Sequence, residues 1–390
     1  MHLGLMTVES PRAHLGKSMA NQAVIKNPCE LLLDIEIQGE KRPGIWRVVE
    51  KYVKDIKGTG GNFSVGYKAI HEDGTEAFLK ATDIGLLKRH SSQSALVKMS
   101  EALNEQTFER TILEICHGNN MDRVVHALDY GEYETTHEGV RDFVFFIMFE
   151  IAESDVRQQI DQRRRGGMSW TATALHNLAV AIHQLHTEKI AHNDIKPSNF
   201  LVFDEHLQKI ADLGRATYDK QVGPWDTSPF SGDQTYAAPE FYYRAVTLKT
   251  TAGKIAFEVR QASDLYLLGS LGYFLITGEA MTPMILNYLR PEHHPNNWCG
   301  TYEDVLPYVW DAHGEAMALF DNELPADEAG NIVKIAMELR NAIVELTSPP
   351  PNKRGHPKNI LQQASQYSLE RYISLFNRIA KSMALVEGAK

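Results

Sequence analysis

The centre of the chain reads His192-Asn193-Asp194-Ile195-Lys196-Pro197-Ser198-Asn199, and Asp212-Leu213-Gly214 follows, with Asp212 eighteen positions after Asp194. One loop thus offers a carboxylate, a lysine and an amide, with a second carboxylate shortly downstream. One carboxylate can accept the proton of an attacking hydroxyl group. The other carboxylate and the amide can hold magnesium against nucleotide phosphates. The stretch therefore contains the groups that phosphoryl transfer requires.

These residues resemble the catalytic loop and the metal-binding Asp-x-Gly motif of the protein kinase superfamily. The resemblance implies that Asp194 accepts or orients the proton of the incoming hydroxyl, and that Lys196 neutralises charge on the transferred phosphoryl group. It also implies that Asn199 and Asp212 bind Mg²⁺. The lysine at position 196 resembles the serine/threonine branch. ATP is then the expected phosphoryl donor, and a protein hydroxyl is the expected acceptor.

Composition is compatible with this hypothesis. The 390 residues, 43% apolar, can bury one large core or two moderate ones. A formal net charge of −10 argues against nucleic acid as the main partner. Three scattered cysteines favour a reduced, cytoplasmic setting. No secretory signal opens the chain, and the apolar run from Leu265 to Ile276 is too short to cross a bilayer, so no membrane partner is expected. Nothing in the composition indicates the oligomeric state.

The order of the elements predicts an α+β fold in two lobes. Residues 1–30 have no clear period and are expected to form a flexible leader. Residues 31–150 are expected to form a small, mainly β lobe with one long helix. Residues 151–390 are expected to form a larger, mainly α lobe. Two regions of that lobe exceed the family minimum, near 245–260 and 281–327, and are read as insertions.

Local patterns predict individual elements. His71-Glu72-Asp73-Gly74-Thr75 reads as a hairpin turn between short strands. A helix is expected over residues 93–116, and the continuous apolar run Phe143 to Met148 predicts a strand buried on both faces. Another helix is expected directly before the catalytic loop, and a closing amphipathic helix over residues 365–385. The first of these two helices is marked by Leu175, Leu178, Ile182 and Leu185 at helical spacing.

The segment from Gly58 to Ala69 resembles the glycine-rich loop that covers ATP phosphates. Glycine is needed there because a side chain would keep the backbone amides away from the phosphate oxygens. The match is imperfect, because the third glycine of the motif falls on Phe63 or on Ser64, depending on the direction of counting. A plain turn between two strands is the alternative. The residues expected at the phosphates are Gly58, Gly60, Gly61, Phe63 and Ser64.

Lys80 ends Ala77-Phe78-Leu79-Lys80, which is similar to the Val-Ala-Ile-Lys strand of the family. A lysine in a cleft loses hydration and needs an anionic partner to remain charged. The resemblance implies a glutamate on the following helix. Glu109 fits the pattern best, and Glu105 is the alternative. An ordinary solvated helix face is the simpler explanation for either acid.

The segment Ile147-Met148-Phe149-Glu150-Ile151-Ala152 resembles the strand that links the two lobes. The resemblance implies that backbone groups at Glu150 and Ala152 bind adenine, with Phe149 as the bulky gatekeeper behind the base. Asp155 could then reach the ribose. The alternative is an apolar strand that ends in an acidic turn.

One departure from the family concerns regulation. The usual arginine before the catalytic aspartate, which pairs with a phosphate on the activation loop, is Asn193 here. We therefore expect a kinase of the non-RD type whose activity does not require activation-loop phosphorylation. Another departure is Asp233, which stands where the family places a threonine.

Three features concern the scaffold of the large lobe. The resemblance implies a buried ion pair between Glu240 and Arg354, and an aspartate, Asp264, that braces the catalytic loop from a central helix. The cluster His293 to Cys299 invites a zinc hypothesis, but it lacks a second pair of ligands at metal-site spacing, so a packed surface loop is favoured.

Three other functions remain open. A nucleotide-binding pseudokinase or interaction scaffold is favoured by the altered glycine loop. It is opposed by four intact residues, Lys80, Asp194, Asn199 and Asp212. A small-molecule kinase is opposed by Lys196. A nucleotidyl-transferring relative would use the same fold with exchanged roles.

Overall fold

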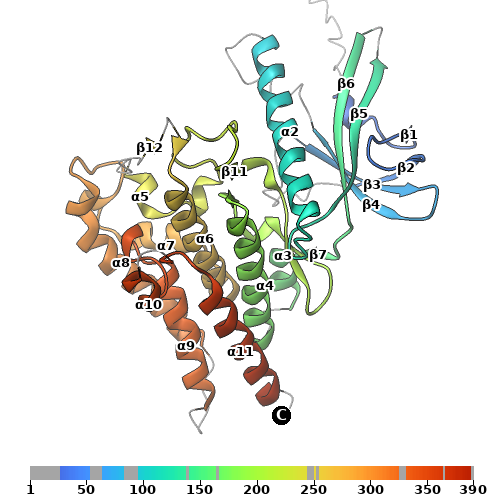
Figure 1. The fold of residues 1–390 in the computed structure, drawn as a ribbon. Coiled ribbons are helices and arrows are strands. Elements are labelled where there is room, and N and C mark those ends of the chain that lie inside the picture. Colours follow the sequence, from blue (N-terminus) through green and yellow to red (C-terminus); the bar gives the residue numbers. More distant parts are fainter. Residues whose placement is uncertain are drawn as a thin grey trace, which may run out of the picture.

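A computed structural model describes residues 27–52, 64–82, 95–137, 140–163, 167–243, 250–251, 254–324, 331–362 and 365–387. These residues form a small lobe made of a sheet and one long helix, followed by a larger helical lobe (Figure 1). The expected two-lobed α+β fold is confirmed.

The small lobe contains a six-stranded antiparallel sheet in the order β1-β2-β3-β4-β6-β5. Its strands are β1 (Glu36–Ile37), β2 (Trp46–Lys51), β3 (Ser64–His71), β4 (Glu76–Thr82), β5 (Ala127–His137) and β6 (Val140–Phe149). The expected turn lies between β3 and β4, where the Gly74 N–H donates to the His71 carbonyl at 2.9 Å. In β4, Ala77, Leu79 and Ala81 are fully buried in the lobe core. Because side chains alternate along a strand, the residues between them face the other lobe.

Of the expected leader, residues 27–30 are described, and they pack on the small lobe. Pro28–Glu30 form the 3₁₀ helix η1, and Cys29 is 2% exposed within the lobe core. The Tyr67 hydroxyl donates to the Cys29 carbonyl at 2.6 Å, and this bond fastens the segment to β3.

The long helix of the small lobe is α2 (Ala95–Gly118), displaced by two residues from the expected range. It lies beside the sheet and faces the large lobe (Figure 1). Phe108, Ile112 and Leu113 bury one side of α2 against the large core. The helix therefore carries side chains from the small lobe to the boundary between the lobes.

The large lobe is built around two buried helices. Its helices are α3 (Val156–Arg163), α4 (Met168–Thr187), α5 (Pro239–Tyr242), α6 (Phe257–Thr277), α7 (Met281–Tyr288), α8 (Tyr302–Asn322), α9 (Asn331–Leu346), α10 (Pro357–Leu361) and α11 (Glu370–Glu387). Its short strands are β7 (Ser154–Asp155), β8 (Ile190–Ala191), β9 (Phe200–Val202), β10 (Gln208–Ile210), β11 (Thr217–Tyr218), β12 (Thr250–Thr251) and β13 (Lys254–Ile255). The 3₁₀ helices are η2 (Pro197–Asn199), η3 (Leu213–Arg215), η4 (Gln234–Tyr236), η5 (Pro291–His293) and η6 (Pro351–Lys353).

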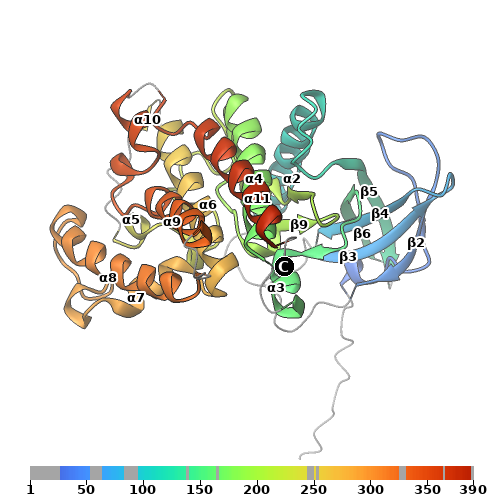
Figure 2. The ribbon, with the colours of Figure 1, turned by 90° about the horizontal axis from the view of Figure 1, so that it is seen from below.

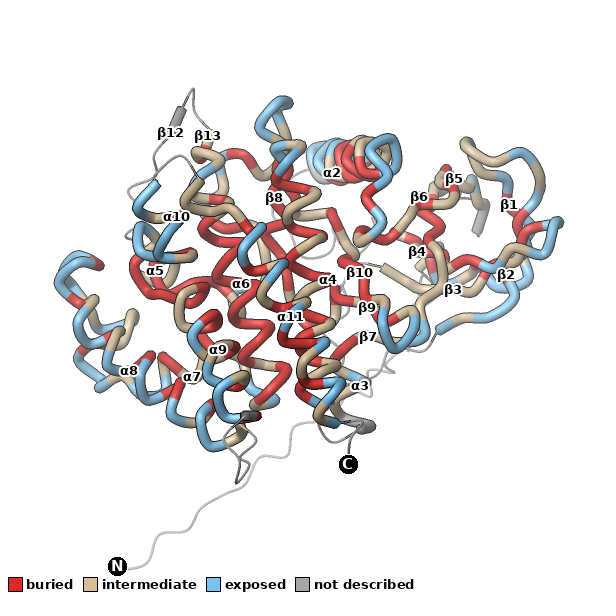
Figure 3. Tube along the Cα trace, turned by 60° about the horizontal axis from the view of Figure 1, so that its bottom comes forward, coloured by how far each residue is buried: buried red, intermediate tan, exposed pale blue. Residues whose placement is uncertain are grey.

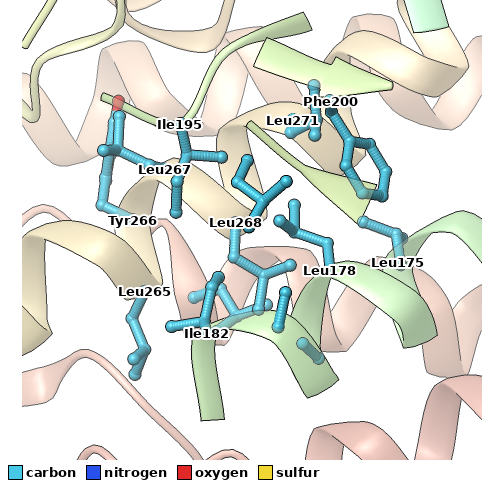
Figure 4. Close-up of a cluster of buried hydrophobic side chains, with 14 of the residues drawn as sticks. Leu175, Leu178, Ile182, Ile195, Phe200, Leu265, Tyr266, Leu267, Leu268 and Leu271 are labelled. Carbon is cyan, nitrogen blue, oxygen red and sulfur yellow. The ribbon is translucent and has the colours of Figure 1, made fainter. Parts of the chain in front are cut away.

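The core of this lobe lies between α4 and α6, where the tube is almost wholly buried (Figure 3). The four apolar residues predicted before the catalytic loop are all fully buried on α4. Leucines of α6 meet them from the facing helix (Figure 4). Ile195 of the catalytic loop packs into the same cluster, so the loop is anchored to the core by an apolar side chain.

The C-terminal helix α11 packs along α4 (Figure 2). It runs over Glu370–Glu387, a few residues later than the expected closing helix. Tyr372, Phe376, Ile379 and Met383 form its buried face, as the sequence period predicts. No described helix is both long and apolar enough to cross a membrane.

The two expected insertions differ in structure. The first contains the β12–β13 hairpin and ends where α6 begins at Phe257. The second is largely helical, since it contains α7 and α8. Within it, His293 stacks on Tyr308 with ring centroids 3.5 Å apart. Among the described residues, no group of three or more His, Cys, Asp or Glu side chains is arranged to hold a metal ion.

Candidate active site

Lys80 joins the two lobes through an ion-pair cluster. Its Nζ atom lies 2.9 Å from Oδ1 of Asp212 and 3.3 Å from Oε1 of Glu109. The three side chains come from β4, from the segment before η3 and from α2. Glu109, the glutamate that best fits the family pattern, lies within ion-pair distance of Lys80. The geometry requires α2 to be packed inward.

The three charges perturb one another. Burial alone would lower the pKa of Lys80, but the carboxylates of Asp212 and Glu109 outweigh it and raise this pKa above its ordinary value. The Lys80 ammonium lowers the pKa of Asp212 to about 2. Burial raises the pKa of Glu109 by more than Lys80 lowers it. At neutral pH, Asp212 is therefore the firm anionic partner and Glu109 the weaker acid.

Asp194 is held at both carboxylate oxygens. Oδ1 accepts a hydrogen bond from the Asp233 N–H at 2.7 Å, and Oδ2 accepts one from Nδ2 of Asn199 at 3.0 Å. Nζ of Lys196 lies 3.1 Å from Oδ2 of Asp194 and 3.6 Å from Oδ2 of Asp233. Asp233, which replaces the threonine of the family, thus supplies a second carboxylate to Lys196.

The catalytic loop is braced from α6. Oδ2 of Asp264 accepts the His192 N–H at 2.9 Å, and Oδ1 accepts the Asn193 N–H at 2.8 Å. Asp264 is fully buried and its Oδ2 also lies 2.9 Å from Nε2 of His186. The expectation that Asp264 braces this loop is confirmed.

Asn193 and Asp212 both have a φ angle of 63°, in the left-handed region. Asn and Asp adopt this conformation more readily than other residues with side chains. Nδ2 of Asn193 lies 3.2 Å from the Ala191 carbonyl, 3.1 Å from the Arg215 carbonyl and 3.1 Å from the Thr217 hydroxyl. The Asn193 side chain therefore ties the start of the catalytic loop to the start of the activation segment.

Arg260 of α6 holds the middle of the activation segment. It is 3% exposed, and its guanidinium donates to the carbonyls of Trp225 at 2.9 Å, Ser228 at 2.7 Å and Pro229 at 3.3 Å. Burial lowers the pKa of Arg260 to about 10, against the opposing effect of two aspartates. The Arg260 guanidinium therefore joins α6 to the backbone of the activation segment.

Trp225 connects that segment to the Asp212-Leu213-Gly214 motif. Its indole N–H donates to the Gly214 carbonyl at 2.8 Å, and the Arg215 guanidinium lies 4.1 Å from the indole ring centroid. Asp226 pairs with Lys254 of β13 at 3.2 Å. The activation segment is thus attached at several points to the elements that surround it.

A cavity of about 480 Å³ opens between the lobes beside this cluster. Lys80, Asn199 and Asp212 line it together with the segment from Phe149 to Asp155. The Glu150 carboxylate is bound by Lys209 at 2.7 and 2.9 Å and by the His126 N–H at 2.8 Å. Lys209 therefore holds the Glu150 side chain, and the Glu150 N–H donates to the His126 carbonyl at 3.2 Å.

Asp155 lines the cavity and directly precedes α3. Its Oδ1 accepts the Gln158 N–H at 2.9 Å, and its Oδ2 lies 3.1 Å from Arg157. A carboxylate can accept about four hydrogen bonds, so these contacts leave capacity for a hydroxyl group. Of the expected phosphate loop, Ser64 begins β3 and lines the cavity. Gly58, Gly60, Gly61 and Phe63 lie outside the described residues.

Sequence reasoning did not identify Arg260, Lys209 or the cavity-facing Phe78. A signal for Arg260 was its position one helical turn before Asp264, at the start of a long, mostly apolar run. No comparable signal marks Lys209, because its burial in β10 is seen only in the structure. Both bind partners that are far apart in the sequence, so spacing alone could not reveal their contacts.

The end of the activation segment is fixed by the expected ion pair. Nη1 and Nη2 of Arg354 lie 2.9 and 3.1 Å from the two Glu240 oxygens, and both side chains are buried. Arg354 also donates to the carbonyls of Ser348, Ala262 and Pro349. The prediction of this pair is confirmed.

The family model of the protein kinase domain matches residues 58–297, which is more than half of the chain. The chain belongs to the protein kinase family. Members of this family use ATP and Mg²⁺ and act on proteins. The match spans the catalytic loop, the activation segment, helix α6 and all of the cavity lining except Tyr52.

The curated relatives of this kinase are distant. It is 25% identical to the dual specificity protein kinase TTK of Mus musculus over 58% of this chain and 26% of the relative. It is 26% identical to the serine/threonine-protein kinase atg1 of Dictyostelium discoideum over 62% of this chain and 33% of the relative. Identity to the serine/threonine-protein kinase PknA of Corynebacterium glutamicum is 25%, over 45% of this chain and 35% of the relative. The chain therefore spans about a quarter to a third of the length of these relatives.

Proposed function

We propose that this protein is an active serine/threonine kinase that transfers the γ-phosphoryl group of ATP to a protein hydroxyl. The observation that carries the proposal is the convergence of Lys80, Asp194, Asn199 and Asp212 beside one cavity, with Lys80 paired to Glu109. The pairing matters because an unpaired ammonium in a cleft would lose its charge or leave the site. Two of the relatives named above are serine/threonine kinases, which supports that specificity.

In this proposal, Asp194 accepts the proton of the acceptor hydroxyl. Its two oxygens are fixed by Asp233 and Asn199, so the carboxylate needs little reorganisation during the reaction. Lys196, 3.1 Å from Asp194, neutralises charge on the transferred group.

Lys80 binds the nucleotide phosphates, and backbone groups at Glu150 and Ala152 bind the adenine. Asp155 is assigned to the ribose, and Ser64 to the edge of the phosphate loop. Gly58, Gly60, Gly61 and Phe63 remain assigned to that loop from the sequence alone.

The metal donors fit Mg²⁺. Hard cations of this kind take oxygen ligands, and Asn199 and Asp212 both offer oxygen atoms at the cavity. Nδ2 of Asn199 donates hydrogen bonds to the Asp194 carbonyl at 2.9 Å and to Oδ2 of Asp194 at 3.0 Å. The amide oxygen of Asn199 is therefore the atom left for a cation. When bound, Mg²⁺ would neutralise phosphate charge.

We also propose that the activity does not require activation-loop phosphorylation. Asn193 replaces the arginine that would bind such a phosphate, and its side chain is used for contacts to Arg215 and Thr217. Arg260 supplies the cationic group that holds residues 225–229, and its partners are carbonyls. Phosphatase treatment of the purified protein is expected to leave the activity within about twofold.

The direct test uses γ-labelled and, separately, α-labelled ATP with Mg²⁺ and a panel of protein acceptors. Label from the γ position is expected on serine or threonine, and is expected to fall by at least a hundredfold in Asp194→Asn. Asp212→Ala should lose the same transfer because it removes a metal ligand. Transfer of α label would instead indicate nucleotidyl transfer. Nucleotide binding without any transfer would favour the pseudokinase alternative.

A further inference from the structure

Phe78 faces the cavity beside Lys80. The two residues lie two positions apart on β4, so their side chains share a face of the sheet. Ala77 and Leu79, which alternate with them, are fully buried on the opposite face. Both Phe78 and Lys80 line the cavity between the lobes. Phe78 occupies the position of the alanine in Val-Ala-Ile-Lys, so this chain places a phenyl ring where the motif has a methyl group.

The ring occupies space that a glycine leaves open. Gly66 on β3 pairs with Lys80 across the sheet. A Cβ atom at Gly66 would lie 2.8 and 2.9 Å from Cε2 and Cζ of Phe78, closer than nonbonded carbon atoms approach. Any larger residue at position 66 would therefore displace the ring. Gly66 and Phe78 form a matched pair, in which the absence of one side chain makes room for the other.

A second ring extends this surface. Tyr52 lies beside Phe78, with centroids 5.6 Å apart and planes inclined by 31°. Leu201 of β9 and Ala211, which precedes Asp212, line the same cavity from the large lobe. The cavity thus has an aromatic wall on the small-lobe side and an aliphatic wall on the large-lobe side. A flat, apolar-faced group fits between two such walls.

We propose that Phe78 is the residue that stacks on the base of the bound nucleotide, and that Gly66 sets its position. The proposal rests on the proposed kinase function, which supplies the nucleotide. Stacking between a base and an aromatic side chain corresponds to a roughly 5- to 150-fold difference in affinity. Phe78 then determines affinity through the base, whereas Lys80 acts on the phosphates.

The test is a double-mutant cycle on Phe78→Ala, Gly66→Val and the double variant. Dissociation constants are measured by calorimetry for Mg·ATP, for adenosine and for tripolyphosphate. Phe78→Ala is expected to weaken adenosine and Mg·ATP by the same factor, between roughly 5- and 150-fold, and to leave tripolyphosphate unchanged. Gly66→Val is expected to weaken adenosine because it pushes the ring into the cavity. The double variant should bind adenosine more tightly than either single variant, because valine then occupies the vacated space.

Phe78→Leu is the matched control, because it keeps apolar volume without an aromatic face. It is expected to bind adenosine at least threefold more weakly than the wild type. Wild-type affinity in Phe78→Leu, or strictly additive effects in the cycle, would overturn the stacking role while leaving the kinase function intact. A wild-type protein that binds neither Mg·ATP nor adenosine would overturn both. Thermal unfolding of each variant establishes that it is folded, and if Phe78→Ala does not fold, Gly66→Val and Phe78→Leu decide the matter.

Discussion

Lys80 is shared by two carboxylates of unequal acidity. Asp212 is held ionised by Lys80 with a pKa of about 2, so it stays charged throughout the physiological range. Glu109 contacts the same ammonium, but burial raises its pKa above the ordinary 4.5. On acidification, the Glu109 carboxylate is therefore protonated before the Asp212 carboxylate, and Lys80 loses its charged partner on α2 first.

This difference predicts a pH-dependent stability term for Glu109. Between pH 4.5 and the raised pKa, the native state binds more protons at this site than the unfolded state does. The free energy of unfolding contributed by Glu109 therefore falls as pH rises through that window. Asp212, whose pKa is depressed, contributes stability that is lost only as pH falls below about 4. Urea unfolding of the wild type and Glu109→Gln from pH 5 to pH 8 measures the effect. We expect the stability of the wild type relative to the variant to be greatest at pH 5. A difference that grows with rising pH would contradict this assignment.

Asn193 is predicted to matter through its amide nitrogen. Aspartate tolerates the left-handed φ angle at this position, so Asn193→Asp changes the side chain while sparing the backbone. The variant replaces a donor to three acceptors with a buried carboxylate oxygen that faces two carbonyls. We expect it to lower the free energy of unfolding by about 2–4 kcal/mol. Chemical denaturation measures the loss, with Asn119→Asp as an exposed control. Equal stability of the two variants would show that the Asn193 contacts carry little energy.

The activation segment depends on contacts with α6, a helix that follows it in the sequence. Arg260 of α6 reaches back to carbonyls of residues 225–229, which belong to no helix or strand. A buried backbone carbonyl group without a hydrogen-bond partner carries a free-energy cost that an exposed one does not. We therefore expect that the segment loses its ordered path when the guanidinium is removed.

Arg260→Met tests this expectation, because methionine keeps apolar volume and removes the donors. Catalytic efficiency toward the protein acceptor should fall by roughly tenfold or more, since each lost charge-assisted hydrogen bond is worth about 1.5–3 kcal/mol. The dissociation constant for Mg·ATP should change by less than about threefold. Hydrogen exchange should increase in residues 223–231 and stay unchanged in α4. Arg260→Lys, which retains the charge but cannot reach several carbonyls at once, should recover only part of the activity. Full activity in both variants would remove Arg260 from the mechanism.

Structural features could be predicted from the sequence where the interactions that produce them are between residues close together in the chain. The helix before the catalytic loop followed from hydrophobic period, and the strand β6 followed from a continuous apolar run. The residues from Asp194 to Asn199 meet because one tight loop and η2 bring them together. Arg260, by contrast, bonds to carbonyls, which have the same form in every residue. The packing of the Phe78 ring over Gly66 also depends on the pairing of β3 with β4. The sequence pattern does not specify which side chain fills the space above Gly66.

For the whole molecule, the lobes share the site, but the large lobe supplies most of its rigidity. The catalytic loop is anchored by Ile195 in the core (Figure 4) and by hydrogen bonds to Asp264 on α6. The small lobe contributes Lys80 and Phe78 from one strand and Glu109 from one helix. The two-lobed fold could be predicted because the strand-rich and helix-rich halves are separate in the sequence. The helical structure of the second insertion was not predicted, since polar and aromatic residues interrupt its apolar pattern.

Mutations in the ion pair of Glu240 and Arg354 test whether the end of the activation segment unfolds together with the large lobe. Arg354 is fully buried, and its hydrogen bonds join that segment to α6 and to the connection after α9. Glu240→Gln leaves a buried guanidinium without its counter-charge, and Arg354→Met leaves a buried carboxylate. Each change should lower the free energy of unfolding by about 3–5 kcal/mol, and the double variant should lose less than the sum, because it leaves no unpaired charge. Urea denaturation of the cycle measures the coupling. Glu338→Gln, which breaks the exposed pair with Arg378, is the matched control and should cost less than about 1 kcal/mol. Additive losses at Glu240 and Arg354, or losses no larger than the control, would mean that the pair does not hold these segments together.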